Sequence, residues 1–314
     1  MEALICKENI PACMIGTWAW GNGMNGSKMV FGQKYSEEQL LETFYKAYET
    51  GFYMWDTAEV YGMGNSEKLL GKCIKGKEDI IISTKYLPGK KYKSGSMKNS
   101  LAGSMERLGV SCIDLYWLHQ AFCLKENIME AVELLKTGKI KALGISNASL
   151  EEVKEAECLL KKNGYRLSAV QNHFSLLCMG EEQLEIIKWC NANNVLYFGY
   201  MILEQGALSG HYDSKHPFPA LSMRGFSFNK SKFKKIQKLL DYERELAQKY
   251  QVDTSQIPIV WAVSKQIIPI VGLTKEKHAA ELEKGSKIVL TPDEITKIEK
   301  LAKESGVVCK GSWE

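Results

Sequence analysis

The sequence lacks paired cysteines, clustered histidines and long apolar runs, and each absence excludes a class of protein. Its nine cysteines include no C-x-x-C pair and its five histidines are scattered, which argues against a disulfide framework and a zinc site. No stretch approaches the roughly 18 apolar residues of a membrane-spanning helix. Residues 1–11 carry three charged side chains and do not resemble a signal peptide. We therefore expect a cytoplasmic protein with reduced thiols, no metal and no membrane partner.

An excess of charge of one sign is also nearly absent. The 41 Lys and Arg residues exceed the 37 Asp and Glu residues by a net charge of +4, which is spread along the chain. Nucleic-acid binding needs a concentrated basic surface, so we expect a small-molecule substrate and no nucleic-acid partner. No Pro-, Gly- or Ser-rich linker divides the chain. We expect a single domain over residues 1–314, as a monomer or weak homo-oligomer.

The organising feature that is present is an alternation of short β-rich runs with longer amphipathic segments. Several runs are continuously apolar, as in parallel strands covered on both faces. The eight runs are Met14–Trp18, Phe52–Asp56, Ile80–Thr84, Ile113–Leu118, Ile140–Ser146, Ala169–Asn172, Val195–Tyr200 and Ile267–Gly272. This α/β pattern fits either a closed (β/α)8 barrel or a large doubly wound sheet.

Start and stop signals mark the helices between these runs. Ser36 and Ser149 each precede acidic residues and then an apolar helical pattern, as N-caps do. Gly51 and Gly164 follow the two helices as stop signals, and Pro292 fits the first turn of a last helix. Further helices are expected over 181–194, 229–250 and 254–264, with a long loop over residues 206–229.

Polar side chains stand at the carboxyl end of one predicted strand after another, where α/β barrels carry their active sites. The residues are Asp56, Tyr61, Lys85, His119, Ser146, Asn147, Gln171, Asn172, Tyr200, Gly272, Thr274 and Lys275. Each one alone is compatible with an ordinary turn or surface position. Their shared position favours an active site.

Four of these residues have the side chains that carbonyl reduction requires. The hydroxyl of Tyr61 can protonate a developing alkoxide if its pKa, about 10 when unperturbed, is lowered toward neutrality. An ammonium such as that of Lys85 lowers it, and the Asp56 carboxylate can hold that ammonium charged. His119 can donate a hydrogen bond to the carbonyl oxygen. No side chain supplies hydride, so a nicotinamide cofactor is implied.

Five segments together resemble the aldo-keto reductase superfamily, and the resemblance extends from about residue 16 to about residue 281. They are 54–62 (with D-T-A-x-x-Y-G), 65–71, 83–85, 114–119 (D-L-Y-x-x-H) and 138–147 (matching G-K-I-R-x-I-G-V-S-N). The resemblance implies a (β/α)8 TIM barrel that binds NADP(H), in preference to NAD(H). It assigns Tyr61 as the general acid or base, Lys85 and Asp56 as the pair that tunes it, and His119 as the orienting donor.

The resemblance also implies a cofactor site and a substrate site. Ser146, Asn147 and Gln171 would hold the nicotinamide carboxamide, and Tyr200 would stack on the nicotinamide ring. The other implied cofactor-binding residues are Thr17, Trp18, Asp56, Met201, Leu203, Gln205, Gly206, Gly272, Thr274, Lys275, His278 and Glu281. Substrate contacts are expected from Trp18, Trp20, Tyr61 and His119. With Met24 and Phe226, the tryptophans would form an aromatic mouth that suits planar or hydrophobic carbonyls.

Two stretches depart from the family pattern. Met201 and Ile202 replace the Ser-Pro of its Y-S-P-L loop. His278 stands where an arginine is often found, and Leu282 stands where an asparagine is usual. Lys275 remains available for a 2′-phosphate. The four catalytic positions are unchanged.

Three functions are compatible with these residues. The first is reduction of an aldehyde or ketone. The second is the reverse oxidation of an alcohol, with Tyr61 as the base. The third, from a different class, is an NADP(H)-binding regulatory or sensor subunit with little turnover.

Other features favour ordinary structural roles. Residues 21–26 match G-x-G-x-x-G, but no apolar helix follows, so a glycine-rich loop is favoured over a Rossmann motif. Trp55 is expected to face the helices, because side chains alternate along a strand. His173, His211 and His216 are expected on the surface or in loops, although His211 and His216 could reach the pocket from the long loop.

Overall fold

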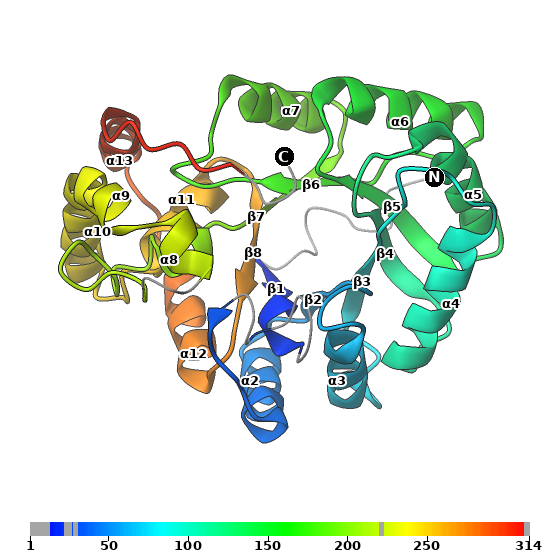
Figure 1. Cartoon of the computed structure of the whole chain (residues 1–314), viewed down its shortest axis with the longest axis horizontal. Helices are drawn as coiled ribbons and strands as arrows, with labels where there is room; N and C mark the ends of the chain where they lie inside the picture. The colour runs from blue at the N-terminus through cyan, green and yellow to red at the C-terminus, as the bar shows by residue number, and fades with distance from the viewer. Residues whose placement is uncertain (1–12, 22–26, 28–30, 220–222, 311–314) are drawn as a thin grey trace.

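The computed structural model describes residues 13–21, 27, 31–219 and 223–310. Met24 and most of the 21–26 glycine-rich segment lie outside these ranges. Eight parallel strands form a closed barrel in sequence order, with β8 paired to β1. Figure 1 shows the strands grouped at the centre with helices around them. The predicted (β/α)8 barrel is therefore confirmed.

All eight predicted runs contain a strand of the barrel. The strands are β1 (Met14–Gly16), β2 (Met54–Asp56), β3 (Ile81–Tyr86), β4 (Ile113–Leu118), β5 (Ile140–Ser146), β6 (Ala169–His173), β7 (Leu196–Tyr200) and β8 (Ile268–Gly272). The first run was predicted too long. Trp18 begins a 3-10 turn, η2 (Trp18–Trp20), in which the Trp20 amide donates to the Thr17 carbonyl at 2.9 Å.

The predicted helix signals coincide with observed helix ends. The helices are α2 (Glu37–Glu49), α3 (Asn65–Ile74), α4 (Ser96–Leu108), α5 (Leu124–Lys136), α6 (Leu150–Lys162), α7 (Glu181–Ala192), α8 (Met223–Ser227), α9 (Lys230–Lys235), α10 (Gln237–Tyr250), α11 (Gln256–Ser264), α12 (Glu276–Gly285) and α13 (Pro292–Glu304). The Ser36 hydroxyl caps α2, and Ser149 and Thr291 form capping boxes at α6 and α13. Gly51 and Gly164 adopt positive φ after α2 and α6.

The connection between β7 and β8 differs from the sequence prediction in two places. The single helix predicted over 229–250 is two helices, α9 and α10, because the backbone at Ile236 leaves the helical region with ψ of 7°. The predicted loop over 206–229 contains the short helix α8. Figure 1 shows α8, α9 and α10 gathered at one side of the barrel.

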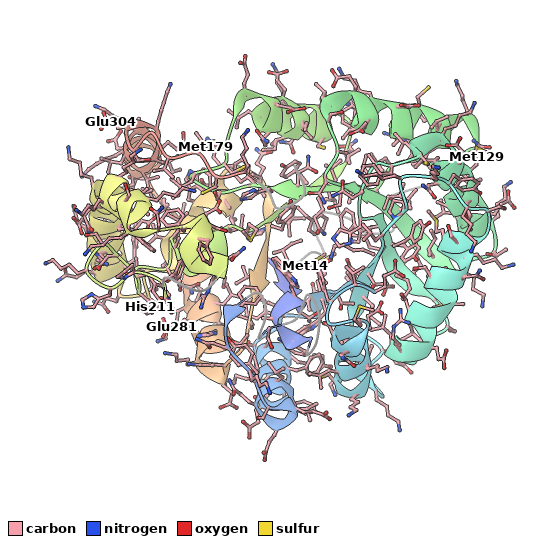
Figure 2. The ribbon with its side chains drawn as sticks, viewed as in Figure 1. Met14, Met129, Met179, His211, Glu281 and Glu304 are labelled. Carbon is pink, nitrogen blue, oxygen red and sulfur yellow. The ribbon has the colours of Figure 1, made fainter. Side chains whose placement is uncertain are left out.

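Alternation along the strands separates two apolar cores. The inner core fills the barrel with Met14, Met54, Leu115, Trp117, Ala142, Ala169, Leu196 and Phe198, and Figure 2 shows Met14 within the ring of strands. Trp55, between Met54 and Asp56, belongs to the outer core beneath the helices, as predicted. Trp117 pairs in register with Gly144, where a Cβ would overlap the indole. The Trp117 indole therefore requires glycine at position 144.

Glu243 on α10 is a buried acid that lowers the stability of the fold. It is 0% exposed, and neither carboxyl oxygen has a hydrogen-bond partner in the described structure. Burial raises the pKa of Glu243 well above its usual range, against a smaller opposing effect of Arg244, so the folded state favours the protonated carboxyl more than the unfolded chain does. The unfolded chain ionises the same group above about pH 4.3, which favours unfolding as the pH rises.

We therefore expect Glu243→Leu to increase the free energy of unfolding at pH 7 by about 1–3 kcal/mol, the penalty for a buried unsatisfied polar group. Chemical denaturation measures this gain, which should be smaller at pH 4. Glu245→Leu, at a 69% exposed side chain on the same helix, is the control and should change stability by no more than about 0.5 kcal/mol. A Glu243→Leu protein less stable than wild type at pH 7 would contradict the prediction.

Candidate active site

Three strand ends bring the predicted catalytic side chains together at one rim of the barrel. Asp56 ends β2, Lys85 lies near the end of β3, and His119 follows β4. Asp56 is two residues beyond the interior residue Met54, and His119 is two residues beyond Trp117. The period of two along a strand therefore turns both side chains toward the barrel axis above the inner core.

Lys85 is the centre of the polar network at this rim. It is 0% exposed, and its ammonium forms an ion pair with the Asp56 carboxylate. It also donates to the Thr57 carbonyl at 2.8 Å and approaches the Tyr61 hydroxyl to 3.4 Å. The Ser83 hydroxyl donates to Asp56 at 2.8 Å. Contacts therefore connect the buried Asp56 and Lys85 side chains to the partly buried Tyr61 hydroxyl.

Burial sets the direction in which the pKa values of Tyr61, Lys85 and His119 are shifted. It raises the pKa of Tyr61 well above its usual value, with further contributions from Asp56 and Tyr200. The predicted lowering toward neutrality is therefore not observed, because desolvation of the phenolate dominates. Burial also lowers the pKa of Lys85, although Asp56 opposes this effect. Burial and then the Lys85 charge lower the pKa of His119 well below its usual range, so the imidazole is neutral.

A cavity of about 300 Å³ opens in front of Tyr61 and His119. Most predicted site residues line it: Trp18, Asp56, Tyr61, His119, Ser146, Asn147, Gln171, Tyr200, Met201, Leu203, Gln205, Gly206, Gly272, Thr274 and His278. Asn147 donates to the His119 carbonyl at 2.9 Å and accepts from the Tyr200 hydroxyl at 2.6 Å. These bonds connect the loops that follow β4, β5 and β7.

Five predicted site residues lie outside the lining of this cavity. Lys85 lies beneath Tyr61, and Thr17 is buried with its hydroxyl donating to the Asp56 carbonyl at 3.0 Å. Trp20 is a correction: it is 2% exposed, packs against Trp55 and donates its indole N–H to the Leu273 carbonyl at 2.7 Å. The η2 turn directs it into the outer core, away from the substrate mouth. The other two residues are Lys275, which is exposed, and Glu281.

The aromatic wall of the cavity contains residues that the sequence did not reveal. Phe31 and Tyr35 line it, and the Phe31 ring meets Trp18 edge-on at 5.3 Å. Trp18 in turn stacks near Tyr61, with centroids 6.0 Å apart. Phe226, predicted at the mouth, is 72% exposed and does not line the cavity. Phe31 and Tyr35 lie 15 or more residues after the end of β1, so inspection of the residues that directly follow each strand does not find them.

A second cavity, of about 480 Å³, adjoins the first and shares Leu203, Val271, Gly272 and His278 with it. Its basic lining residues are His211, Lys277, His278 and Lys284, and Glu281 also lines it. Figure 2 shows His211 and Glu281 at the same side of the barrel, beside α12. Lys275, predicted for a phosphate, is absent from this lining, whereas Lys277 is present. The two cavities are therefore neighbours that share part of their lining.

His278 contributes no positive charge to the second cavity at neutral pH. Burial, Lys277 and Lys275 lower its pKa to about 4. Lys277 and Lys284 are the two lysines of this lining.

The position of His173 also differs from the prediction. It was predicted on the surface but is 2% exposed at the end of β6, where its Nε2 lies 2.8 Å from a Glu204 carboxylate oxygen. A local pattern does not show this, because the partner is 31 residues away. His211 and His216 have exposed side chains, as predicted.

None of the helices within the described ranges is long and apolar enough to cross a membrane. Residues 13–21, 27, 31–219 and 223–310 also contain no group of three or more His, Cys, Asp or Glu side chains that could hold a metal ion.

The sequence model of the Aldo/keto reductase family matches residues 13–303. This chain belongs to that family. Aldo/keto reductases are NADP-dependent oxidoreductases. This chain forms a closed barrel whose strands end in polar residues.

Known aldo/keto reductases resemble the chain over most of its length. The chloroplastic pyridoxal reductase of Arabidopsis thaliana is 31% identical over 309 residues, covering 92% of this chain and 82% of the relative. The aldo-keto reductase yakc [NADP(+)] of Schizosaccharomyces pombe is 27% identical over 311 residues, covering 92% and 90%. A glycerol dehydrogenase of Gluconobacter oxydans has the same fold, with a TM-score of 0.80, 23% identity and coverage of 96% and 94%.

Proposed function

We propose that this aldo/keto reductase interconverts an aldehyde or ketone and the corresponding alcohol, with NADP(H) as the hydride carrier and Tyr61 as the proton donor in reduction. The observation that carries the proposal is the chain of contacts from Asp56 through Lys85 to Tyr61, which ends at the 300 Å³ cavity. The bound cofactor would supply the hydride that no side chain can supply.

The residues of the chain perform the remaining steps. Tyr61 is protonated because burial raises its pKa, so it can give its proton to the oxygen of the reduced carbonyl. The Lys85 ammonium, 3.4 Å away, stabilises the phenolate that remains. His119 is neutral and can donate one ring N–H to the carbonyl oxygen. Asp56 keeps the ammonium charged and in place.

The two adjoining cavities offer suitable groups for the two ends of a dinucleotide. In the first cavity, Ser146, Asn147 and Gln171 offer amide and hydroxyl groups for a nicotinamide carboxamide, and Tyr200 offers a ring for stacking. In the second cavity, Lys277 offers a charge for a phosphate, whereas Lys284 is paired with Glu281 at 3.0 Å. Support also comes from relatives: yakc carries NADP(+) in its name, and an aldo/keto reductase from Klebsiella pneumoniae was crystallised with NADP and acetate.

The direct test is oxidation of NADPH over a panel of neutral aromatic, aliphatic and anionic carbonyls. The panel should include 4-nitrobenzaldehyde and pyridoxal, since the Arabidopsis relative is a pyridoxal reductase. The aromatic lining predicts faster turnover of planar, neutral substrates. If wild type and Tyr61→Phe both bind NADPH but share the same negligible rate over the panel, the chain is instead an NADP(H)-binding regulatory or sensor subunit.

We expect Lys277, rather than Lys275, to select NADPH over NADH. Lys277→Ala should raise the KM for NADPH about 5- to 10-fold, the loss of one charge-assisted contact to the 2′-phosphate. The KM for NADH, which has no such phosphate, should not change. Lys275→Ala is the matched control, since Lys275 does not line the second cavity. An equal effect of the two substitutions on NADPH would exclude this role for Lys277.

A further inference from the structure

A buried ion pair lies directly behind the first cavity. His173 ends β6, and Glu204 begins η3 (Glu204–Gly206), the turn that follows β7. They are 2% and 6% exposed, and neither lines the cavity. The Ser175 hydroxyl donates to the same Glu204 oxygen that His173 contacts. The pair therefore joins the ends of two neighbouring strands.

The first link from the pair to the cavity runs through Tyr200. The His173 and Tyr200 rings are stacked, with centroids 5.5 Å apart and planes 19° from parallel. Tyr200 lines the cavity, and its hydroxyl bonds to Asn147 at 2.6 Å. Because the buried His173 ring covers one face of Tyr200, the phenol cannot tilt toward that side without displacing it.

The second link runs through the backbone after β7. Met201, Glu204 and Gln205 have φ values of 62°, 46° and 55°, in the left-handed region that costs non-glycine residues free energy. Met201 and Gln205 line the cavity on either side of Leu203. Ile202 stands where the family pattern has proline, so the ring constraint on this backbone is missing. The anchored Glu204 side chain restrains the turn instead.

We propose that His173 and Glu204 are positioning residues, which hold the Tyr200 ring and the left-handed turn in the arrangement that receives the nicotinamide end of the cofactor. This inference rests on the proposed function, since it assumes that NADP(H) occupies the first cavity. Neither residue touches the cofactor site directly. Their effect is transmitted by the stacked ring on one side and by the turn backbone on the other.

The groups around His173 favour its positively charged form at neutral pH. Burial lowers the pKa of His173, but hydrogen bonds to Cys178 and Glu204 and the negative charge of Glu204 outweigh burial and raise the pKa to about 10. Cys309 also approaches Glu204. Removing one partner would leave the other charge buried and uncompensated, which destabilises a protein more than removing both. The test therefore needs variants in which the two residues change together.

The test compares the double variant His173→Leu/Glu204→Leu with wild type. We expect its dissociation constant for NADP⁺, followed by tryptophan fluorescence, to rise about tenfold and its kcat to fall by a similar factor, as for small misplacements of reacting groups. The KM for the aldehyde should change less than about twofold, since the substrate contacts remain. His173→Gln/Glu204→Gln, which removes both charges and the stacked ring but keeps hydrogen-bonding groups at both positions, should show the same shifts if the leucine double variant does not fold.

Glu157→Gln controls for lost stability alone. Glu157 is a buried acid on α6 that contacts the Arg166 side chain and accepts from the Leu167 amide. It does not line the first cavity. The Glu157→Gln substitution should lower the melting temperature without changing the dissociation constant for NADP⁺. The proposal is overturned if the His173 variants have the same dissociation constant for NADP⁺ and the same kcat as the Glu157→Gln control. If wild type binds NADP⁺ but reduces no carbonyl, the proposed function fails, and the comparison of dissociation constants still tests the pair.

Discussion

Replacing Tyr61 with phenylalanine is expected to lower kcat for aldehyde reduction by about 10²- to 10⁴-fold, the range for loss of a general acid. The substitution removes the only phenol hydroxyl that the structure places within 3.4 Å of Lys85 among the described residues. The ring remains, and with it the contact to Trp18. The dissociation constant for NADP⁺ should therefore change little.

Tyr35→Phe is the matched control, because Tyr35 also lines the cavity but its hydroxyl bonds to Gln33. It should keep kcat within about threefold of wild type, as expected for a group outside the proton transfer. The pH profile adds a second check. Because burial raises the pKa of Tyr61, the acid form persists through neutral pH, and reduction should decline only in alkaline solution. A Tyr61→Phe enzyme with the wild-type kcat would exclude Tyr61 as the proton donor.

Replacing Lys85 with methionine is expected to affect both stability and turnover. The ammonium is the cationic partner of the Asp56 carboxylate, and both side chains are almost fully buried. Removing one partner of a buried ion pair typically costs about 3–5 kcal/mol of unfolding free energy. The same change removes the charge beside the Tyr61 hydroxyl, so kcat should also fall steeply. Denaturant unfolding and NADPH oxidation measure the two effects separately.

The double variant Asp56→Asn/Lys85→Met distinguishes the two effects. With the carboxylate removed as well, part of the lost stability should return, because no uncompensated charge stays buried. Turnover should not return, because Tyr61 still lacks its ammonium. A double variant as unstable as Lys85→Met alone would show that the ion pair does not account for the loss.

The sequence predicts the fold and the catalytic rim because both depend on local patterns. Apolar runs define the strands, and the first polar residue after each run lies at the same rim of a parallel barrel, as Asp56 and His119 do. The sequence does not predict where Trp20 lies, because a 3-10 turn replaces the end of the first predicted strand. That turn depends on packing against Trp55, which is distant in sequence.

Other features of the site depend on contacts that no local pattern contains. The pairing of His173 with Glu204 joins two strand ends. The pKa of Tyr61 rises because the folded chain removes water from the phenol, whereas residue types alone suggested that the nearby lysine would lower it. Lys277 lines the second cavity and Lys275 does not, which depends on the direction that each side chain of α12 and its N-cap takes. Such properties follow from the three-dimensional arrangement.

The tryptophan that fills the barrel also fixes the orientation of a hydrogen atom near the site. The Trp117 indole N–H donates to the Ser83 hydroxyl oxygen at 2.6 Å, and an indole nitrogen can only donate. The Ser83 hydroxyl oxygen must therefore accept the bond from Trp117. Its single hydrogen is then directed to the Asp56 carboxylate, at an oxygen–oxygen distance of 2.8 Å. The hydroxyl rotor of Ser83 is thus held in one orientation, and the inner core presents a fixed dipole to the carboxylate that holds Lys85.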